Sequence, residues 1–237
     1  MHMLGDLLIL AILLFCAWQG YKRGVIGGIL AILVIIVSMY GANLVANTYS
    51  YEFTSMTRPF ISGYLDGVER EIVDDLAPSG LRALSTEDLL RHEPGLEPVM
   101  ARQVFLSLGV HESRTEPLLE RYFTYRDGGA TVNQAMTDVL VEAFCFYLVY
   151  IIAFLLIIIA LTVVYNIIPL SFRLPGLTLV DDIGGGLLGF AQGLLLVFML
   201  TWALGYVGLL FPEDFLNSTV FTEMLIRANP VVGFINL

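Results

Sequence analysis

Long apolar runs constrain this chain more than any other feature of its sequence. Residues 139–168 carry one charge, Glu142, and residues 183–211 carry none. A transmembrane helix needs about 20 mostly apolar residues, so both runs are long enough to span a bilayer. Residues 25–46 form a third such run, and residues 7–18 reach marginal length when their neighbours are included. The chain has only 14% charged residues, whereas soluble domains carry about 25%.

The four apolar runs predict two helical hairpins. No Lys or Arg precedes the first run and no small-residue cleavage site follows it, which favours a membrane span over a signal peptide. We therefore expect an all-α polytopic membrane protein with four transmembrane helices and an extracytoplasmic helical insertion. The expected parts are a first hairpin (1–46), the insertion (47–138), a second hairpin (139–211) and a C-terminal amphipathic helix with its tail (212–237).

Basic residues in the short connections predict the orientation. The first hairpin loop, residues 19–24, holds Lys22 and Arg23, and the second, residues 169–182, holds Arg173. The N-terminal tail holds no Lys or Arg, and the C-terminal tail holds only Arg227. Short loops rich in Lys and Arg stay in the cytoplasm. The pattern predicts that both hairpin loops lie in the cytoplasm, and that both termini and segment 47–138 lie outside it.

The insertion is predicted to be folded rather than a linker. Ile61, Leu65, Val68, Ile72 and Leu76 repeat at helical spacing. Ser85 and Thr131 stand at expected helix starts, and Pro98 and Pro117 suit first-turn positions. Residues 51–138 hold eight arginines against fifteen acidic residues, which leaves seven negative charges. This acidity argues against binding to nucleic acid or to anionic lipid. The helices could pack on one another or lie along the bilayer.

Glycines recur every four residues in two of the runs: Gly20, Gly24 and Gly28 in the first hairpin, and Gly185, Gly189 and Gly193 in the second. Small residues at this spacing let transmembrane helices approach closely. We expect the two ridges to pack against each other near the cytoplasmic side. Lining of a pore or substrate path is the alternative.

Carboxylates mark the ends of two runs. Asp181 and Asp182 precede the fourth run, where they could cap the helix, form an ion or proton site, or pair with Lys22 or Arg23. Asp6 is interpreted as an interfacial residue or a helix cap. The three histidines are isolated, and no catalytic or metal-ligand spacing is present, so the sequence predicts neither an enzyme nor a cofactor.

These features together resemble the colicin V production protein (CvpA) family. An early acid, Asp6, leads an apolar run into a Gly-x-x-Arg-Gly turn at Gly20, Arg23 and Gly24. Pro175, Asp181 and glycines every four residues then follow, and Ser218 stands near the start of the last helix. The resemblance covers about residues 3–46 and 139–229. Asp182 and Gln192 stand where the family often has basic residues, and the insertion is longer than in compact members.

The resemblance implies a multi-pass protein of the bacterial cytoplasmic (inner) membrane, linked to colicin V or toxin production and secretion and to envelope homeostasis. We expect a scaffold or accessory factor, with an oligomeric channel or transporter subunit as the alternative. The expected partners are the lipid bilayer and either a second copy of the chain or an envelope or secretion protein.

Overall fold

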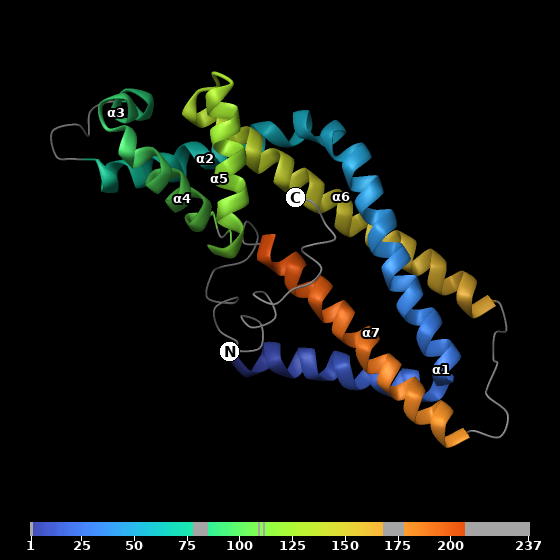
Figure 1. Cartoon of the computed structure of the whole chain (residues 1–237). Helices are drawn as coiled ribbons and strands as arrows, with labels where there is room; N and C mark the ends of the chain where they lie inside the picture. Colours follow the sequence, from blue (N-terminus) through green and yellow to red (C-terminus); the bar gives the residue numbers. More distant parts are fainter. Residues whose placement is uncertain (1, 78–84, 109, 111, 168–177, 207–237) are drawn as a thin grey trace. The chain divides into compact units, whose positions relative to one another are not determined.

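The structure, a computed structural model, describes residues 2–77, 85–108, 110, 112–167 and 178–206 (Figure 1). All regular secondary structure in these residues is helical, as predicted. The elements are α1 (His2–Tyr49), η1 (Ser50–Phe53), α2 (Thr54–Leu76), α3 (Thr86–His92), η2 (Pro94–Leu96), α4 (Glu97–Ser107), α5 (Glu112–Asp127), α6 (Val132–Ile167) and α7 (Thr178–Tyr206). Arg173, Pro175, Ser218 and the expected C-terminal helix lie outside the described residues.

Three helical stretches are long and apolar enough to cross a membrane: Ile9–Leu76, Val132–Asn166 and Thr178–Leu200. Large apolar side chains stand exposed along them, among them Leu33, Tyr40, Leu156, Ile159 and Leu187. Soluble monomers rarely expose contiguous apolar patches larger than a few hundred Å². The composition of these helices therefore suits a lipid environment, and the number of separate spans stays a prediction.

The described chain forms two compact units. One contains residues 2–47, 149–167 and 178–204, and the other contains the described residues of segment 48–148 together with residues 205 and 206. In the first unit, α6 and α7 meet through Tyr150 and Trp202, whose ring centroids lie 4.9 Å apart. α1 meets α6 through close approaches at Gly27 and Gly41.

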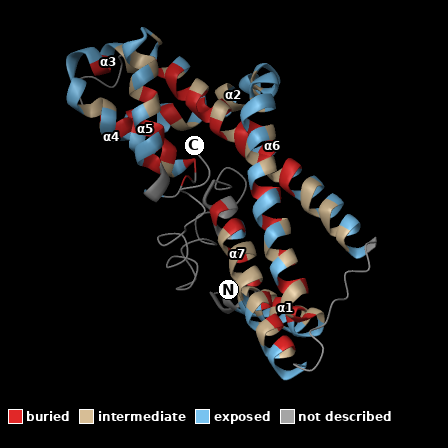
Figure 2. Ribbon diagram, turned by 45° about the vertical axis from the view of Figure 1, so that its right-hand side comes forward, coloured by how far each residue is buried: buried red, intermediate tan, exposed pale blue. Residues whose placement is uncertain are grey.

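The second unit has a hydrophobic core of its own, built by α2, α3, α4, α5 and the first part of α6 (Figure 2). Leu65, Val104, Phe105 and Tyr122 are almost completely buried in it. The apolar positions predicted on α2 do contact this core, since Leu65 and Ile72 belong to it and the other three pack against it. The helices of this segment therefore pack on one another.

The predicted helix starts are confirmed at three places and wrong at one. Ser85 accepts a hydrogen bond from the backbone N–H of Asp88, and Thr131 and Gln134 form a reciprocal capping box. Pro98 lies in the first turn of α4. Pro117 instead lies inside α5, which begins at Glu112. Proline lacks the N–H donor and its ring crowds the carbonyl four residues earlier, so both effects of Pro117 fall on the first turn of α5, while the rest of the helix follows it.

Candidate functional site at the break in α1

Helix α1 is interrupted at Gly24. This residue has φ 75° and ψ −178°, while the residues on both sides remain helical. An extended backbone at positive φ is accessible almost only to glycine. The expected connection at residues 19–24 is thus a one-residue break, after which the helix restarts at Val25. The restart leaves backbone N–H groups at the new helix start without partners inside the helix.

Asp181, in the first turn of α7, occupies this break. Its Oδ1 accepts a hydrogen bond of 2.9 Å from the backbone N–H of Val25, and the residue is only 1% exposed. The carboxylate therefore caps a helix 156 residues away in sequence. It lies close to the N-terminal ends of two helices, the second half of α1 and α7 itself. Both ends carry a positive partial charge that stabilises a carboxylate.

Gly24 leaves no room for a side chain beside this carboxylate. A Cβ added there would lie 2.5 Å from Oδ2 and 2.8 Å from Oδ1 of Asp181. Glycine is thus required at position 24 both by the backbone conformation and by the close approach of the acid. Replacement by any other residue would disturb the break and its cap together.

The glycine positions of α1 and α7 lie against each other around the break. A Cβ on Gly20 would contact the Gly185 carbonyl oxygen and would lie 2.6 Å from the Cα of Gly189. A Cβ on Gly185 would lie 2.7 Å from the Cα of Gly24. These are backbone atoms, which cannot rotate away as a flexible side chain can. Positions earlier in α1 contact positions later in α7, so the two helices run antiparallel here.

The outer glycines of the two ridges meet side chains instead. A Cβ on Gly193 would lie 3.0 Å from the Cβ of Cys16, and one on Gly28 would lie 2.6 Å from the Cβ of Leu188. The closest backbone approach therefore involves Gly20, Gly24, Gly185 and Gly189. A packing role for all six glycines remains our interpretation of this arrangement.

The two basic residues next to the break contact aromatic rings. Lys22 Nζ lies 3.7 Å from the centroid of the Trp18 ring, and Arg23 Cζ lies 5.8 Å from that of Tyr165. Such cation–π contacts hold a positive charge near an apolar surface. The pairing of an acid with Lys22 or Arg23 stays a prediction. Asp182 is half-buried, and the side chain of Asp6 lies outside the described residues.

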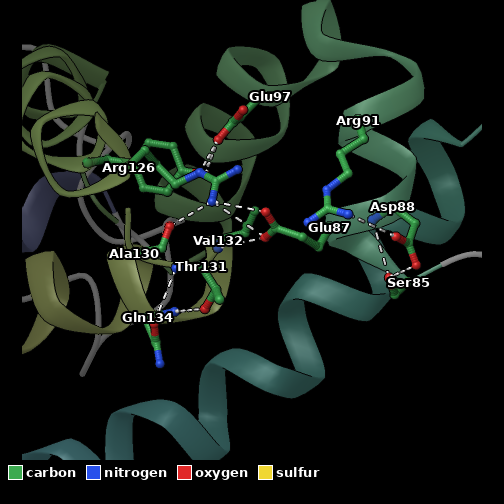
Figure 3. Close-up of polar contacts among 11 residues, drawn as sticks. Ser85, Glu87, Asp88, Arg91, Glu97, Arg126, Ala130, Thr131, Val132 and Gln134 are labelled. Atoms are coloured by element: carbon green, nitrogen blue, oxygen red, sulfur yellow. Dashed lines mark hydrogen bonds and ion pairs between the residues drawn. The ribbon is translucent and has the colours of Figure 1, made fainter. Parts of the chain in front are cut away.

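A second polar cluster, which the sequence did not predict, surrounds Arg126 in the other unit (Figure 3). The guanidinium donates to Glu97 through Nε at 2.6 Å, and through Nη1 to Glu87 at 3.2 Å and to the Ala130 carbonyl at 2.7 Å. Glu87 also accepts from the backbone N–H of Val132. One arginine thus connects α3, α4, α5 and the start of α6.

Tyrosines in this unit donate to partly buried carboxylates. Tyr122 donates to Glu97 at 2.8 Å, and Tyr125 donates to Glu142. Burial, followed by the hydrogen bond to Glu142, raises the pKa of Tyr125 to about 12. Burial also raises the pKa of Tyr122 strongly, with Glu97 adding to the effect. Burial lowers the pKa of Arg126, but the hydrogen bond and charge of Glu97 outweigh it, so that pKa is raised. These groups keep their protons at neutral pH and serve as structural donors.

An open recess of about 490 Å³ adjoins the Arg126 cluster and is lined by Glu87, Arg91, Glu97 and Asp127, among others. In the part of the chain that the structure describes, no group of three or more His, Cys, Asp or Glu side chains is placed to hold a metal ion. The hydrogen bonds of the cluster are directed at protein atoms of four helices. Its arrangement therefore links the helices of this unit in addition to their hydrophobic core.

Comparison with known proteins bears on the second half of the chain. Neither the curated proteins nor the solved structures gave a significant match. A family model described as Colicin V production protein matches residues 119–230, which include Asp181 and the α7 glycines but not Gly20, Arg23 or Gly24. This match confirms, for residues 119–230, the resemblance to the colicin V production protein family that the sequence predicts.

Proposed function

We propose that this chain is a CvpA-like integral membrane protein of the bacterial cell envelope. It acts as a scaffold or accessory factor in colicin V or toxin production or secretion and in envelope homeostasis. The family match and the three apolar helical stretches support a membrane protein of this kind. Its partners in the proposal are the bilayer and either a second copy or an envelope or secretion protein.

One observation carries the choice of a scaffold over a pore. Asp181, at the start of the apolar helix α7, is buried. Its carboxylate accepts a hydrogen bond from the backbone N–H of Val25 and so stabilises the break in α1. Around it, glycine backbones are packed too closely to leave a water-filled path between α1 and α7. Residues of an ion pathway would instead face a wet cavity. This arrangement supports a site that holds helices together.

We further propose that α1 contributes two spans, one on each side of Gly24. Residues 2–23 and 25–49 would each extend over about 33 Å or more at 1.5 Å per residue, against a hydrocarbon thickness of about 30 Å. With α6 and α7 this gives four spans and places both termini and segment 47–138 outside the cytoplasm of an inner-membrane protein. Alkaline phosphatase fused after residue 237 should be active, because this enzyme folds only outside the cytoplasm. An inactive fusion whose phosphatase is protected from protease added outside the cells would overturn this orientation.

Flux measurements distinguish the scaffold from a channel or transporter subunit. The full chain in liposomes should give no ion flux above that of empty liposomes under varied voltage and osmotic tension. Reproducible flux that is lost in both Gly189→Leu and Asp181→Asn would overturn the scaffold proposal and establish the channel.

Complementation tests the envelope role directly. Host cells from which the gene has been removed should become more sensitive to detergent, and the native chain should restore resistance. Arg126→Ala, which removes the link among four helices of the second unit, should restore it poorly at equal membrane abundance. A deletion without any envelope or secretion defect would contradict the proposed role.

A further inference from the structure

Phe53, at the end of η1, and the first three turns of α2 expose an apolar stripe that the hydrophobic core does not use. Phe53 and Tyr64 are 45% and 57% exposed, and between them Met56 and Phe60 are 73% and 76% exposed. Their spacing places these four side chains on one helix face. The core-facing residues of the same helix, Leu65, Ile72 and Val73, are buried. The stripe is therefore an additional apolar surface.

Polar contacts fix which way this stripe faces. Arg58 forms an ion pair with Asp138, and Asp66 accepts a hydrogen bond of 2.7 Å from Asn133. Both partners lie in the first part of α6. Helix α2 is thus held in one rotation within its unit, with Phe60 turned outward.

The apolar stripe ends at Tyr64, although the same outer face of α2 continues beyond it. After Tyr64, the next positions on this side of α2 are Gly67, Glu71 and Asp74, all of them exposed. The helix therefore changes from an apolar to an acidic outer face about halfway along its length. A helix that enters an apolar medium only with its first half needs this pattern.

An apolar recess of about 200 Å³ opens beside the stripe. Its lining includes Phe60, Ile61, Tyr64, Leu65, Leu140 and Phe144. The recess lies between α2 and the first part of α6, and two of its walls, Phe60 and Tyr64, belong to the exposed stripe. Its apolar lining suits a hydrocarbon chain entering from the same side.

We propose that this stripe, Phe53 to Tyr64, is a membrane-interface surface that inserts into the lipid of the leaflet at which α1 ends. The stripe follows α1 after only three residues, and α1 itself exposes Tyr40, Leu44 and Tyr49 up to its end. Aromatic side chains concentrate where spans leave the hydrocarbon, and apolar helix faces lie in that plane. The occupant is zwitterionic lipid, because this unit is strongly acidic and anionic headgroups would be repelled.

Spin-label accessibility tests the proposal in the full chain. Nitroxides are attached at Met56→Cys, Phe60→Cys and, as the matched control on the acidic half of the same face, Glu71→Cys. Cys16→Ala and Cys145→Ser remove the native thiols. In phosphatidylcholine liposomes the ratio of oxygen to nickel-chelate collisions should be several-fold higher at positions 56 and 60 than at 71, because oxygen partitions into lipid and the chelate does not.

Two results would overturn the lipid surface. Equal ratios at positions 60 and 71 would mean that the stripe faces water. Exclusion of both reagents from position 60, relieved when the protein is diluted in lipid, would mean that a second copy covers the stripe. Since the native side chains at positions 56 and 60 are more than 70% exposed, the labels leave the core intact, and an unchanged helical circular dichroism spectrum checks this.

Discussion

Gly189→Ala should weaken the contact between α1 and α7, and Gly186→Ala should not. The two glycines lie three residues apart in the same helix. A Cβ on Gly189 would contact the Cys16 carbonyl oxygen and would lie 2.8 Å from the Cα and 3.0 Å from the N of Gly20. A Cβ on Gly186 would meet nothing closer than 3.8 Å. The substitution is chemically identical, so the pair isolates the effect of the packed backbone.

The magnitude follows from these distances. Carbon atoms pack best at about 3.5–4.0 Å, so a methyl group introduced at position 189 would force the helices apart by roughly 0.5–1 Å and weaken neighbouring contacts. Overpacking of this kind costs about 1–3 kcal/mol. The gain in helix propensity from Gly to Ala, up to about 1 kcal/mol, is common to both variants and cancels in their comparison. Gly189→Ala should therefore be less stable than Gly186→Ala by about 1–3 kcal/mol.

Cys16 provides the readout at this contact. The residue is buried, and its Cβ would lie 3.0 Å from a Cβ on Gly193. In a Cys145→Ser background, maleimide labels Cys16 only when the contact opens, so the labelling rate follows the opening equilibrium. Each 1.4 kcal/mol lost at the contact corresponds to about a tenfold faster rate. Equal rates in the Gly189→Ala and Gly186→Ala variants would refute the reasoning, because the backbone contact would then contribute nothing.

Three further predictions concern the break and the second unit. Gly24→Ala should lower the free energy of unfolding of the first unit by at least about 1–3 kcal/mol, from backbone strain alone. Gly67→Ala should be neutral or stabilising, because Gly67 lies in a helix interior with open space around it. Equal effects of the two substitutions in thermal unfolding would contradict this prediction. Asp181→Ala should lower the stability of the α1–α7 contact by about 0.5–2 kcal/mol through loss of the cap. Asp181→Asn should be less damaging, because an amide oxygen can still accept the hydrogen bond from the Val25 N–H. The rate of Cys16 labelling measures both effects, and a native-like rate in Asp181→Ala would contradict the capping role. The second unit should lose stability as pH rises above about 10, the ordinary tyrosine pKa, because folding raises the pKa of Tyr125 to about 12 and also raises that of Tyr122. Unfolding followed by circular dichroism should show a smaller loss of stability in Tyr125→Phe. An equal loss in that variant would remove Tyr125 as the source of the pH dependence.

Local signals in the sequence were sufficient for most of the helices. The Ser85 cap and the Thr131–Gln134 capping box depend on residues three apart, and most of α6 coincides with the long apolar run that begins at residue 139. The prediction at Pro117 was wrong because a proline is compatible with several positions near a helix start. The length of the connection in the first hairpin was overestimated because Gly20 is also a favourable break residue, yet only Gly24 leaves the helical conformation.

Contacts between distant segments were beyond such signals. The Arg126 cluster joins side chains and backbone from four helices, and nothing in the spacing of Glu87, Glu97 and Arg126 indicates that they meet. One available signal was the Gly128–Gly129 pair. Gly129 has φ 90°, and the turn there brings the Ala130 carbonyl to Arg126 and the Val132 N–H to Glu87. Glycine pairs that follow a basic residue at a helix end are worth examining for such links.

The hydrogen-bond partner of Asp181 could not be predicted from the position of this residue in the sequence. Its place at the start of an apolar helix predicts a cap for that helix, and an acid there would indeed be stabilised by the dipole of α7. The hydrogen bond instead goes to Val25, because Gly24 frees that N–H and the glycines of both helices let α7 approach closely enough to reach it. The acid and the glycines therefore act as one unit. A substitution that moves α7 away from α1 should abolish the cap even when Asp181 itself is unchanged. The stability lost in the double variant Gly189→Leu with Asp181→Ala should therefore be less than the sum of the losses in the two single variants.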